Sequence, residues 1–325
     1  MSFSDFIQIR DQNVFETSAL DLFKYQYSHN LVYQEYCDLI RCTPSNVSQL
    51  EHIPFLPISF FKTHRVSTTS KTPEKIFRSS TTTGQTPSQH YIFSLADYCK
   101  SFREGFRHFY GPITDYTILA VLPSYLERDD ASLVFMANDL IRQSQQSLSG
   151  FYLNEWERLA ETLLTLESNK QKTLLLGVSF ALLSLVEKKQ FVLNHTLVME
   201  TGGMKGRRKE MVRSELHELL GEGFGVENIH SEYGMTELLS QAYSKKNGRF
   251  KCPPWMRVYG RAIDDPLQKV NFGTIGALNI IDLANRFSCA FIATEDIGRC
   301  HSDGSFEVLG RLDQAEIRGC NLLAL

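Results

Sequence analysis

The chain has 325 residues, of which 42% are hydrophobic and 22% are charged, a composition typical of a soluble globular protein with a sizeable core. Its net charge of -3 and the lack of a long basic stripe argue against nucleic-acid binding. The first ten residues do not resemble a signal peptide, and no apolar run is long enough to span a membrane, so stable membrane insertion is not expected. Seven irregularly spaced cysteines without a Cys-x-x-Cys pair favour a reducing cytoplasm and argue against a structural zinc site.

The first part of the chain is expected to be helical. Apolar residues recur near helical spacing from Phe3 to about Cys42, and Pro54 and Pro57 then interrupt regular structure. We therefore assign residues 1–55 to a helical N-terminal part.

A run of hydroxyl side chains follows, with the sequence Arg-Ser-Ser-Thr-Thr-Thr-Gly-Gln-Thr-Pro-Ser over residues 78–88. Such side chains compete for local backbone hydrogen bonds, so the run does not favour a helix. Its hydroxyl and backbone N–H groups can converge on phosphate oxygens, and Gly84 allows close approach because it has no Cβ. The alternative is a solvated surface loop, and neither the Walker pattern nor the dinucleotide-binding glycine pattern is present.

Alternating strands and helices are expected after this run. Strands are predicted at 91–93, 116–122, 173–176 and 196–199, and helices at 95–110, 132–144, 155–168, 182–189 and 207–220. This alternation predicts an α/β core over residues 56–250 with a mostly parallel sheet. Shorter strands at 277–281, 289–293 and 306–309 predict a small β-rich subdomain over residues 251–325.

Four stretches in this order carry a family resemblance. After the hydroxyl run come Tyr-Gly-Met-Thr-Glu at 233–237, Thr-Glu-Asp-Ile-Gly at 294–298 and Gly-Arg-Leu-Asp at 310–313. Together they resemble the core motifs of the adenylate-forming, acyl-activating enzymes. The Thr-Gly-Gly-Met-Lys-Gly segment at 201–206 and a cysteine near the end of the sequence narrow the resemblance to the acyl-protein synthetase branch, the fatty-acid-activating component of bacterial bioluminescence fatty-acid reductase. The resemblance extends from about residue 55 to the end and implies one adenylation domain over residues 1–325.

The resemblance implies how ATP phosphates and Mg²⁺ are held. The β- and γ-phosphates are assigned to Ser79, Ser80, Thr81, Thr82, Thr83 and Gly84. Thr236 is assigned to the α-phosphate and Glu237 to Mg²⁺, for which a carboxylate is a suitable hard ligand. The family usually has glycine where Thr81 stands and often lysine where Ser88 stands. Lys205 could supply that missing charge, and a solvated lysine is the alternative.

The resemblance also implies how the nucleoside is held. Gly202 and Gly203 would let the backbone lie against the adenine, and Tyr233 and Gly234 would lie near it. Asp296 suits the ribose, because an ionised carboxylate accepts hydrogen bonds from both hydroxyls of a cis-diol. Arg311 would reach ribose or phosphate.

The end of the sequence departs from the wider superfamily. The mobile domain that normally follows the Gly-Arg-x-Asp hinge is not expected here, since only twelve residues follow Asp313. The acyl-protein synthetase branch instead uses a cysteine in this place, which implies that Cys320 accepts the acyl group as a thioester. The function expected is therefore ATP-dependent activation of a carboxylic, fatty acid and its transfer to Cys320, for delivery to an acyl reductase or acyl carrier protein.

Three alternatives stay open. A direct acyl-CoA or acyl-carrier-protein ligase would not use Cys320, and a non-catalytic nucleotide-binding relative would perform no chemistry. The third is a serine hydrolase, because Gly-Val-Ser-Phe-Ala at 177–181 lies between a predicted strand and helix, as a nucleophile elbow does. Its partners would be Asp264 or Asp282 with His301, and a serine that caps the helix is the simpler interpretation.

Overall fold

The computed structural model describes residue 9 and residues 11–80, 86–122, 130–153, 155–202 and 211–312. The chain forms two compact units. Unit 1 contains Met1–Ser101, Met235–Ser240 and Lys251–Leu325, and unit 2 contains Phe102–Gly234 and Gln241–Phe250.

Unit 1 begins with two helices, α2 (Gln12–His29) and α3 (Leu31–Leu39). Asp11 caps α2, and Asn30, whose backbone is extended, ends α2 and accepts a hydrogen bond from the Tyr33 N–H at the start of α3. The continuous helical pattern expected up to about residue 42 is therefore divided at this asparagine, because its side chain satisfies a free N–H of a new helix. Three short elements follow: η1 (Leu50–His52), β1 (Leu56–Pro57) and α4 (Phe60–Thr63).

A β-rich layer makes up most of the remainder of unit 1. Its strands are β11 (Met256–Arg261), β12 (Ile275–Asp282), β13 (Phe291–Cys300) and β14 (Phe306–Arg311). Neighbouring strands in this series are antiparallel, and β1 pairs with β13 in parallel. Phe291 at the start of β13 is fully buried and lies against the rings of Phe23 from α2 and Tyr33 from α3, so the helical segment completes the core of this layer.

A separate hairpin in unit 1 carries both ends of the hydroxyl run. Strand β2 (Lys75–Arg78) pairs antiparallel with β3 (Gln89–Ile92). Past the strands, the Ser79 N–H donates to the Ser88 carbonyl over 3.1 Å, and the Ser88 N–H donates to the Ser79 hydroxyl over 2.9 Å. The hairpin therefore fixes Ser79 and Ser88 opposite each other, and residues 81–85 between them lie outside the described part of the chain.

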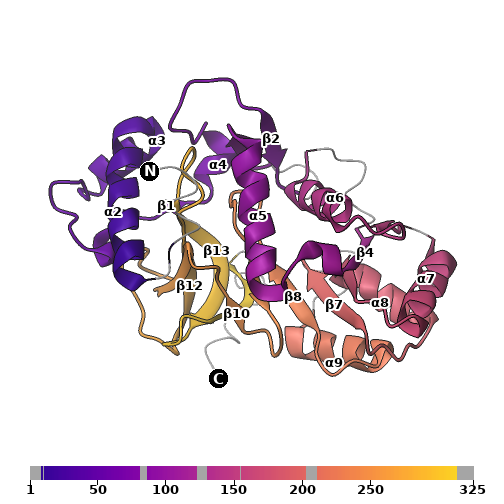
Figure 1. Ribbon diagram of the computed structural model, residues 1–325. Helices are drawn as coiled ribbons and strands as arrows, with labels where there is room; N and C mark the ends of the chain where they lie inside the picture. Colours follow the sequence, from indigo (N-terminus) through magenta and orange to yellow (C-terminus); the bar gives the residue numbers. More distant parts are fainter. Residues whose placement is uncertain are drawn as a thin grey trace. The chain divides into compact units, whose positions relative to one another are not determined.

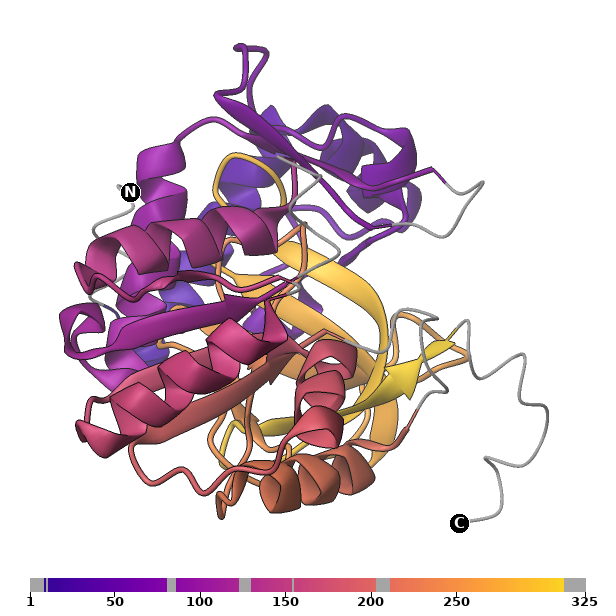
Figure 2. The same ribbon diagram turned by 90° about the vertical axis from the view of Figure 1, so that its right-hand side faces the viewer.

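Unit 2 contains a mostly parallel sheet (Figure 2). Its strands are β4 (Thr117–Val121), β5 (Gly150–Phe151), β6 (Thr173–Val178), β7 (Thr196–Thr201), β8 (His230–Tyr233) and β9 (Ala242–Ser244). They are ordered β9-β8-β7-β6-β4-β5, and only the β8–β9 pair is antiparallel. Every residue of β4 and β6 is buried, as expected of parallel strands that are covered on both faces. Strand β10 (Phe250–Lys251) falls at the boundary between the two units in the chain.

Helices of unit 2 alternate with these strands. They are α6 (Ser132–Ser144), α7 (Trp156–Ser168), α8 (Ser179–Lys188) and α9 (Arg213–Phe224), while α5 (Leu95–Tyr110) contains the boundary between the units. Helices α8 and α9 lie side by side near β7 (Figure 1). A Cβ on Gly223 would come within 2.4 Å of the Val186 Cβ, so the helices pack closely because α9 has glycine there.

These elements confirm the predicted α/β class, with a parallel-rich sheet followed by a β-rich segment. The helix expected over 207–220 was placed incorrectly at both ends, because α9 begins at Arg213, after the non-helical residues 211–212, and continues to Phe224. The helix expected over 182–189 begins earlier, at Ser179, and ends at Lys188. Within the described ranges, no helix combines the length and the apolar character needed to cross a membrane. All six described cysteines are free thiols.

Candidate active site

The Thr236–Glu237 dipeptide lies in a turn of unit 1, in the segment Met235–Ser240. Glu237 is only 4% exposed, and its carboxylate lies within the electrostatic influence of Ser88, Asp296 and Arg311. Burial raises the pKa of Glu237, and the Ser88 hydroxyl and the Arg311 charge partly oppose this rise. The structure thus brings Asp296 and Arg311, from β13 and β14, within electrostatic reach of Glu237, which precedes them by more than fifty residues in the sequence.

Asp296 and Arg311 occupy opposite positions on β13 and β14. The Arg311 Nε lies 3.7 Å from Asp296 Oδ1, and its Nη2 lies 3.2 Å from Glu295 Oε2. Lys62 from α4 is 3.9 Å from the other Glu295 oxygen. Arg311 remains half exposed, so a guanidinium with two neighbouring carboxylates is available at the surface of this unit.

The far end of the Met235–Ser240 segment is anchored by a buried carboxylate. Asp282 accepts hydrogen bonds from the backbone N–H groups of Leu239 and Ser240, at 2.9 and 3.0 Å, and from the Ser240 hydroxyl at 2.6 Å. The Trp255 indole N–H also donates to the Ser240 hydroxyl oxygen, over 2.9 Å. Asp282 therefore has a structural role in fixing the turn that carries Glu237.

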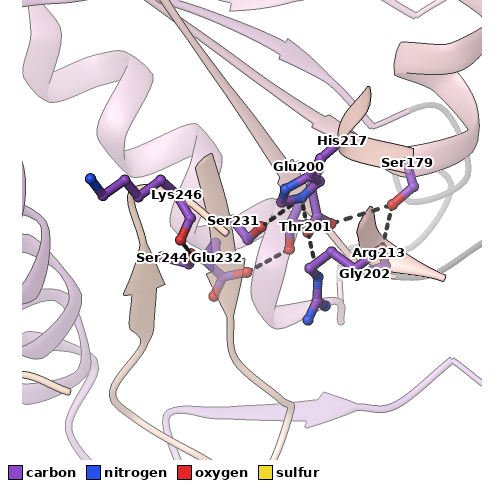
Figure 3. A network of polar contacts seen from close by, with 10 residues as sticks. All are labelled: Ser179, Glu200, Thr201, Gly202, Arg213, His217, Ser231, Glu232, Ser244 and Lys246. Atoms are coloured by element: carbon purple, nitrogen blue, oxygen red, sulfur yellow. Dashed lines mark hydrogen bonds and ion pairs between the residues drawn. The ribbon is translucent and has the colours of Figure 1, made fainter. Parts of the chain in front are cut away.

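Unit 2 contains a second polar network, at the C-terminal ends of β7 and β8 (Figure 3). Glu200 on β7 is 2% exposed and lies 3.2 Å from Arg213 Nε and 3.5 Å from His217 Nε2, both on α9. Ser231 from β8 lies 3.2 Å from the same His217 nitrogen. Burial alone would raise the pKa of Glu200, but its contacts with His217, Arg213 and Ser231 bring it below its ordinary value.

The adjacent carboxylate, Glu232 on β8, is also buried. Its Oε2 accepts a hydrogen bond of 2.5 Å from the Thr201 hydroxyl at the end of β7. Burial raises the pKa of Glu232 to about 7, with a further contribution from the negative charge of Glu200. A Cβ on Gly234 would approach the other Glu232 oxygen to 2.5 Å, so this carboxylate needs a glycine two residues further along.

The remaining residues of the predicted nucleoside site lie beside this network. Gly202 follows β7 with a φ of 68°, in the left-handed region that favours glycine, and Tyr233 ends β8 with its ring 5.8 Å from that of Phe250. The described part of unit 2 therefore places Gly202 and Gly234 directly after the neighbouring parallel strands β7 and β8, which pair in register at Thr201 and Glu232.

Ser179 does not have the environment of a catalytic serine. It is the first residue of α8, and its hydroxyl donates to the Gly202 carbonyl over 2.7 Å and to Glu200 over 3.3 Å. His301 is 2.8 Å from Glu307, Asp282 is engaged with Ser240, and Asp264 is exposed. Ser179 also makes no side-chain cap of α8, so the capping role expected from the sequence is wrong.

Several predicted site residues fall outside the described residues: Thr81, Thr82, Thr83, Gly84, Gly203, Lys205 and Cys320. Ser80, at the edge of the described hairpin, is exposed. The roles assigned to these residues remain predictions. The network around Glu200 was not predicted, although a glutamate next to the last residue of the apolar strand Thr-Leu-Val-Met-Glu-Thr could have indicated a buried polar cluster.

The residues of unit 1 fit a nucleotide with a divalent cation. A Mg²⁺ ion that bridges phosphates needs only one or two protein carboxylates, and Glu237 is a buried carboxylate beside an arginine suited to phosphate. Among the described residues, no group of three or more His, Cys, Asp or Glu side chains could form an all-protein metal site. The donor set therefore fits a cation that takes most of its ligands from phosphate oxygens and water.

Comparisons with known proteins agree with this chemistry. The chain matches the family model described as acyl-protein synthetase, LuxE, over residues 5–96 and 157–324. A long-chain-fatty-acid–luciferin-component ligase from Aliivibrio fischeri is 23% identical over 354 residues, covering 99% of this chain and 89% of the relative.

Solved structures share the fold. ATP-bound MatB from Rhodopseudomonas palustris is 17% identical with a TM-score of 0.54, covering 73% of this chain and 47% of that protein. A 2-hydroxyisobutyryl-CoA ligase in the postadenylation state, in complex with 2-HIB-AMP, is 14% identical with a TM-score of 0.66, covering 93% of this chain and 68% of that protein. The match thus spans less than half the length of the first of these, and at such identities the likeness establishes the fold, as the sequence motifs predicted.

Proposed function

Because the chain belongs to the acyl-protein synthetase family LuxE, we propose that it activates a carboxylic acid with ATP and passes the acyl group to a thiol. In the first step a carboxylate oxygen bonds to the α-phosphorus of ATP, the bond to the β-phosphate bridging oxygen breaks, and pyrophosphate leaves. The product is an acyl-adenylate. The acid is a fatty acid, in keeping with the long-chain-fatty-acid ligase among the relatives.

The observation that carries this proposal is the convergence of Glu237, Asp296 and Arg311 in unit 1. A carboxylate is a weak nucleophile, so catalysis depends on positioning and on charges directed at the phosphates. Arg311 offers a planar donor to phosphate or ribose oxygens, and Asp296 offers acceptors to the ribose hydroxyls. Glu237 would hold Mg²⁺, which supplies the positive charge that neutralises the leaving pyrophosphate.

The remaining roles follow from the family resemblance and the local structure. Ser79 and Ser80 with Thr81–Gly84 would contact the β- and γ-phosphates, and Thr236 the α-phosphate. Gly202, Gly203, Tyr233 and Gly234 would contact the adenine, and Lys205 would add positive charge. The hairpin that holds Ser79 opposite Ser88 supports the phosphate role, because it fixes both ends of the hydroxyl run.

The second step transfers the acyl group. The thiolate of Cys320 attacks the acyl carbonyl, the bond to the AMP oxygen breaks, and a thioester and AMP result. The acyl thioester would then be delivered to an acyl reductase or an acyl carrier protein.

The direct test follows both steps in one reaction. The full chain is incubated with ATP, Mg²⁺ and a panel of carboxylic acids of increasing chain length, and pyrophosphate release and intact protein mass are recorded. We expect acid-dependent pyrophosphate release and an added acyl mass, and the best acid identifies the substrate. Absence of acid-dependent pyrophosphate release with every acid would refute the proposed activity.

A paired variant identifies the carboxylate that matters. Glu237→Gln keeps the size of the side chain and removes its charge, and we expect pyrophosphate release to fall by about a hundredfold or more. Glu307→Gln removes a carboxylate of the same unit that is paired with His301, and it should leave the rate nearly unchanged. Equal rates for the two variants would exclude Glu237 from the site.

A further inference from the structure

His90 connects the hairpin that flanks the hydroxyl run to the turn that carries Glu237. It lies on β3, two residues after Ser88, and is 1% exposed. Its Nδ1 is 2.7 Å from the backbone carbonyl oxygen of Thr236, which lies 146 residues further along the chain. A carbonyl can only accept, so Nδ1 carries the proton and donates it to Thr236. Burial lowers the pKa of His90 to about 4, so the ring is neutral at physiological pH and has one N–H to donate.

Asn285 continues the connection to the next residue of the turn. Its side-chain amide nitrogen donates to the Glu237 carbonyl over 2.7 Å and to the Cys289 carbonyl over 2.9 Å. The amide oxygen of Asn285 lies 3.2 Å from His90 Nε2. With its proton on Nδ1, the neutral ring presents Nε2 as an acceptor, so its contact with the amide oxygen is not a hydrogen bond. The consecutive carbonyls of Thr236 and Glu237 are each held by one donor, the first by His90 and the second by Asn285. Leaving a buried carbonyl without its donor costs free energy, so these two hydrogen bonds resist movement of the turn.

The side chain of Glu237 is tied to the same hairpin. The Ser88 hydroxyl interacts with its carboxylate and opposes the rise in the pKa of Glu237 that burial causes. The hairpin thus holds the backbone of the turn through His90 on β3, and Ser88, directly before β3, interacts with the carboxylate of Glu237. Because Ser79 and Ser88 are also hydrogen-bonded to each other, both ends of the hydroxyl run share this frame.

We infer that His90 is a positioning residue that fixes the Thr236–Glu237 turn against the β2–β3 hairpin, so that the carboxylate of Glu237 and the flanks of the hydroxyl run keep one geometry. The inference rests on the proposed function for its catalytic consequence. It assigns His90 no contact with substrate. The proposed role depends on the hydrogen bond from His90 to the Thr236 carbonyl. The His90 ring also packs edge-on against Phe61, and this packing is a separate contribution to the core.

Two substitutions at His90 test this hydrogen bond. In His90→Asn the amide nitrogen can occupy the position of Nδ1, since both are attached to Cγ, and the donor to Thr236 is kept. His90→Leu fills a similar volume and provides no donor. The control is Tyr33→Phe, which removes another buried hydrogen bond of unit 1, between the Tyr33 hydroxyl and the Pro54 carbonyl at 2.6 Å.

The first readout is amide hydrogen exchange in the protein without nucleotide. We expect His90→Leu to increase exchange of a peptide spanning residues 235–240 by about tenfold relative to wild type, because the turn has lost a buried anchor. His90→Asn should remain near wild type. Tyr33→Phe should leave the exchange rate of this peptide unchanged, even if it lowers the global stability as much as His90→Leu does.

The second readout is acid-dependent pyrophosphate release as Mg²⁺ is varied. In His90→Leu, misplacement of Glu237 should raise the Mg²⁺ concentration needed for half-maximal rate and lower kcat, and the product of the two effects should be about tenfold to a hundredfold. Tyr33→Phe should show neither change. His90→Asn should recover most of the loss. If His90→Leu does not fold, Ser88→Ala removes the other link without deleting a buried ring, and the same rise in Mg²⁺ requirement is expected.

The outcomes separate this inference from the proposed function. A wild type without acid-dependent pyrophosphate release would refute the proposed function, while hydrogen exchange would still report on the anchor. An active wild type with unchanged exchange and Mg²⁺ requirement in both His90→Leu and Ser88→Ala would refute the role of His90. Equal losses in His90→Asn and His90→Leu would also refute it, because the donor to Thr236 would then not be the cause.

Discussion

Asp296 and Arg311 face each other across β13 and β14, as register partners in the backbone and with 3.7 Å between the Asp296 Oδ1 and the Arg311 Nε. The pair combines an acceptor for hydroxyl groups with a donor for anions at one point of the sheet. It is close enough to the buried Glu237 carboxylate for both charges to influence its pKa. The Thr-Glu-Asp-Ile-Gly and Gly-Arg-Leu-Asp motifs thus contribute to the same charged group of residues, and the first prediction concerns the arginine of this group.

Removal of the Arg311 charge should affect nucleotide use far more than stability. Arg311 is half exposed, and ion pairs of this kind contribute about 0–1 kcal/mol, so Arg311→Gln should change the free energy of unfolding little. The loss of a charged contact to phosphate or ribose should raise KM for ATP and lower kcat/KM by about tenfold or more. Pyrophosphate release and urea denaturation check the two parts. Arg158→Gln, which breaks an exposed pair with Glu155 in unit 2, is the control, and equal kinetics in both variants would contradict the role of Arg311.

Ser179→Ala tests the serine-hydrolase alternative. The Ser179 hydroxyl is buried and donates to the Gly202 carbonyl, so its removal should lower the free energy of unfolding by about 1 kcal/mol. ATP-dependent activation should persist, because Ser179 has no assigned role in it. The wild type should show no ATP-independent ester hydrolysis, and labelling of Ser179 by a fluorophosphonate would restore the alternative.

Two amphipathic helices could be predicted to the residue from the sequence, while the bounds of other elements, such as α8 and β13, were displaced by two or more residues. Helices α5 and α6 have the bounds that their amphipathic spacing indicates. Helix α9 is different, because it was predicted to end at Leu220, directly before Gly221. Gly223 serves instead as the close contact with Val186, and the helix ends at Gly225, whose φ is 63°. A glycine that ends a helix and one that packs between helices look the same in a sequence.

The candidate site was predictable where chemistry is concentrated in short motifs and not where it depends on tertiary contacts. Glu237, Asp296 and Arg311 stand in such motifs, and the structure brings them together. His90 and Asn285 stand in no motif, and 195 residues separate them. Their function lies in holding backbone carbonyls, which any suitably placed donor can do, so the sequence carries no pattern for it.

The acyl acceptor can be identified by substitution of Cys320. Burial raises the pKa of Cys252, Cys289 and Cys300 to about 12, so these thiols are not nucleophilic thiolates near neutral pH. Cys320→Ser should still form acyl-adenylate and lose the hydroxylamine-labile acyl mass that the wild type gains. The acylation rate of the wild type should rise with pH toward a midpoint at or below about 8.5.

Burial also raises the pKa of Cys37. Two matched variants control for Cys42 and Cys99, which are only partly buried. Cys42→Ser and Cys99→Ser should acylate like the wild type. Peptide mapping of the acylated protein locates the group directly. An acyl group on another cysteine, or full turnover without protein acylation, would assign the transfer to a different acceptor.

The last prediction concerns the pH dependence of stability that Glu232 imposes on unit 2. Burial raises the pKa of this carboxyl from 4.5 to about 7, so the folded state binds a proton that the unfolded state has released between these values. The free energy of unfolding therefore contains a favourable contribution that is complete below about pH 4.5 and is lost as the pH rises through about 7.

Glu232→Gln is neutral at every pH and keeps an acceptor for the Thr201 hydroxyl. Relative to wild type, the variant should gain on the order of 2 kcal/mol of stability between pH 5 and pH 8. Urea denaturation of both proteins at these two pH values measures the difference, and Glu215→Gln on the exposed first turn of α9 controls for the loss of a surface carboxylate. A difference between Glu232→Gln and wild type that does not change with pH would show that Glu232 ionises like a solvent-exposed glutamate.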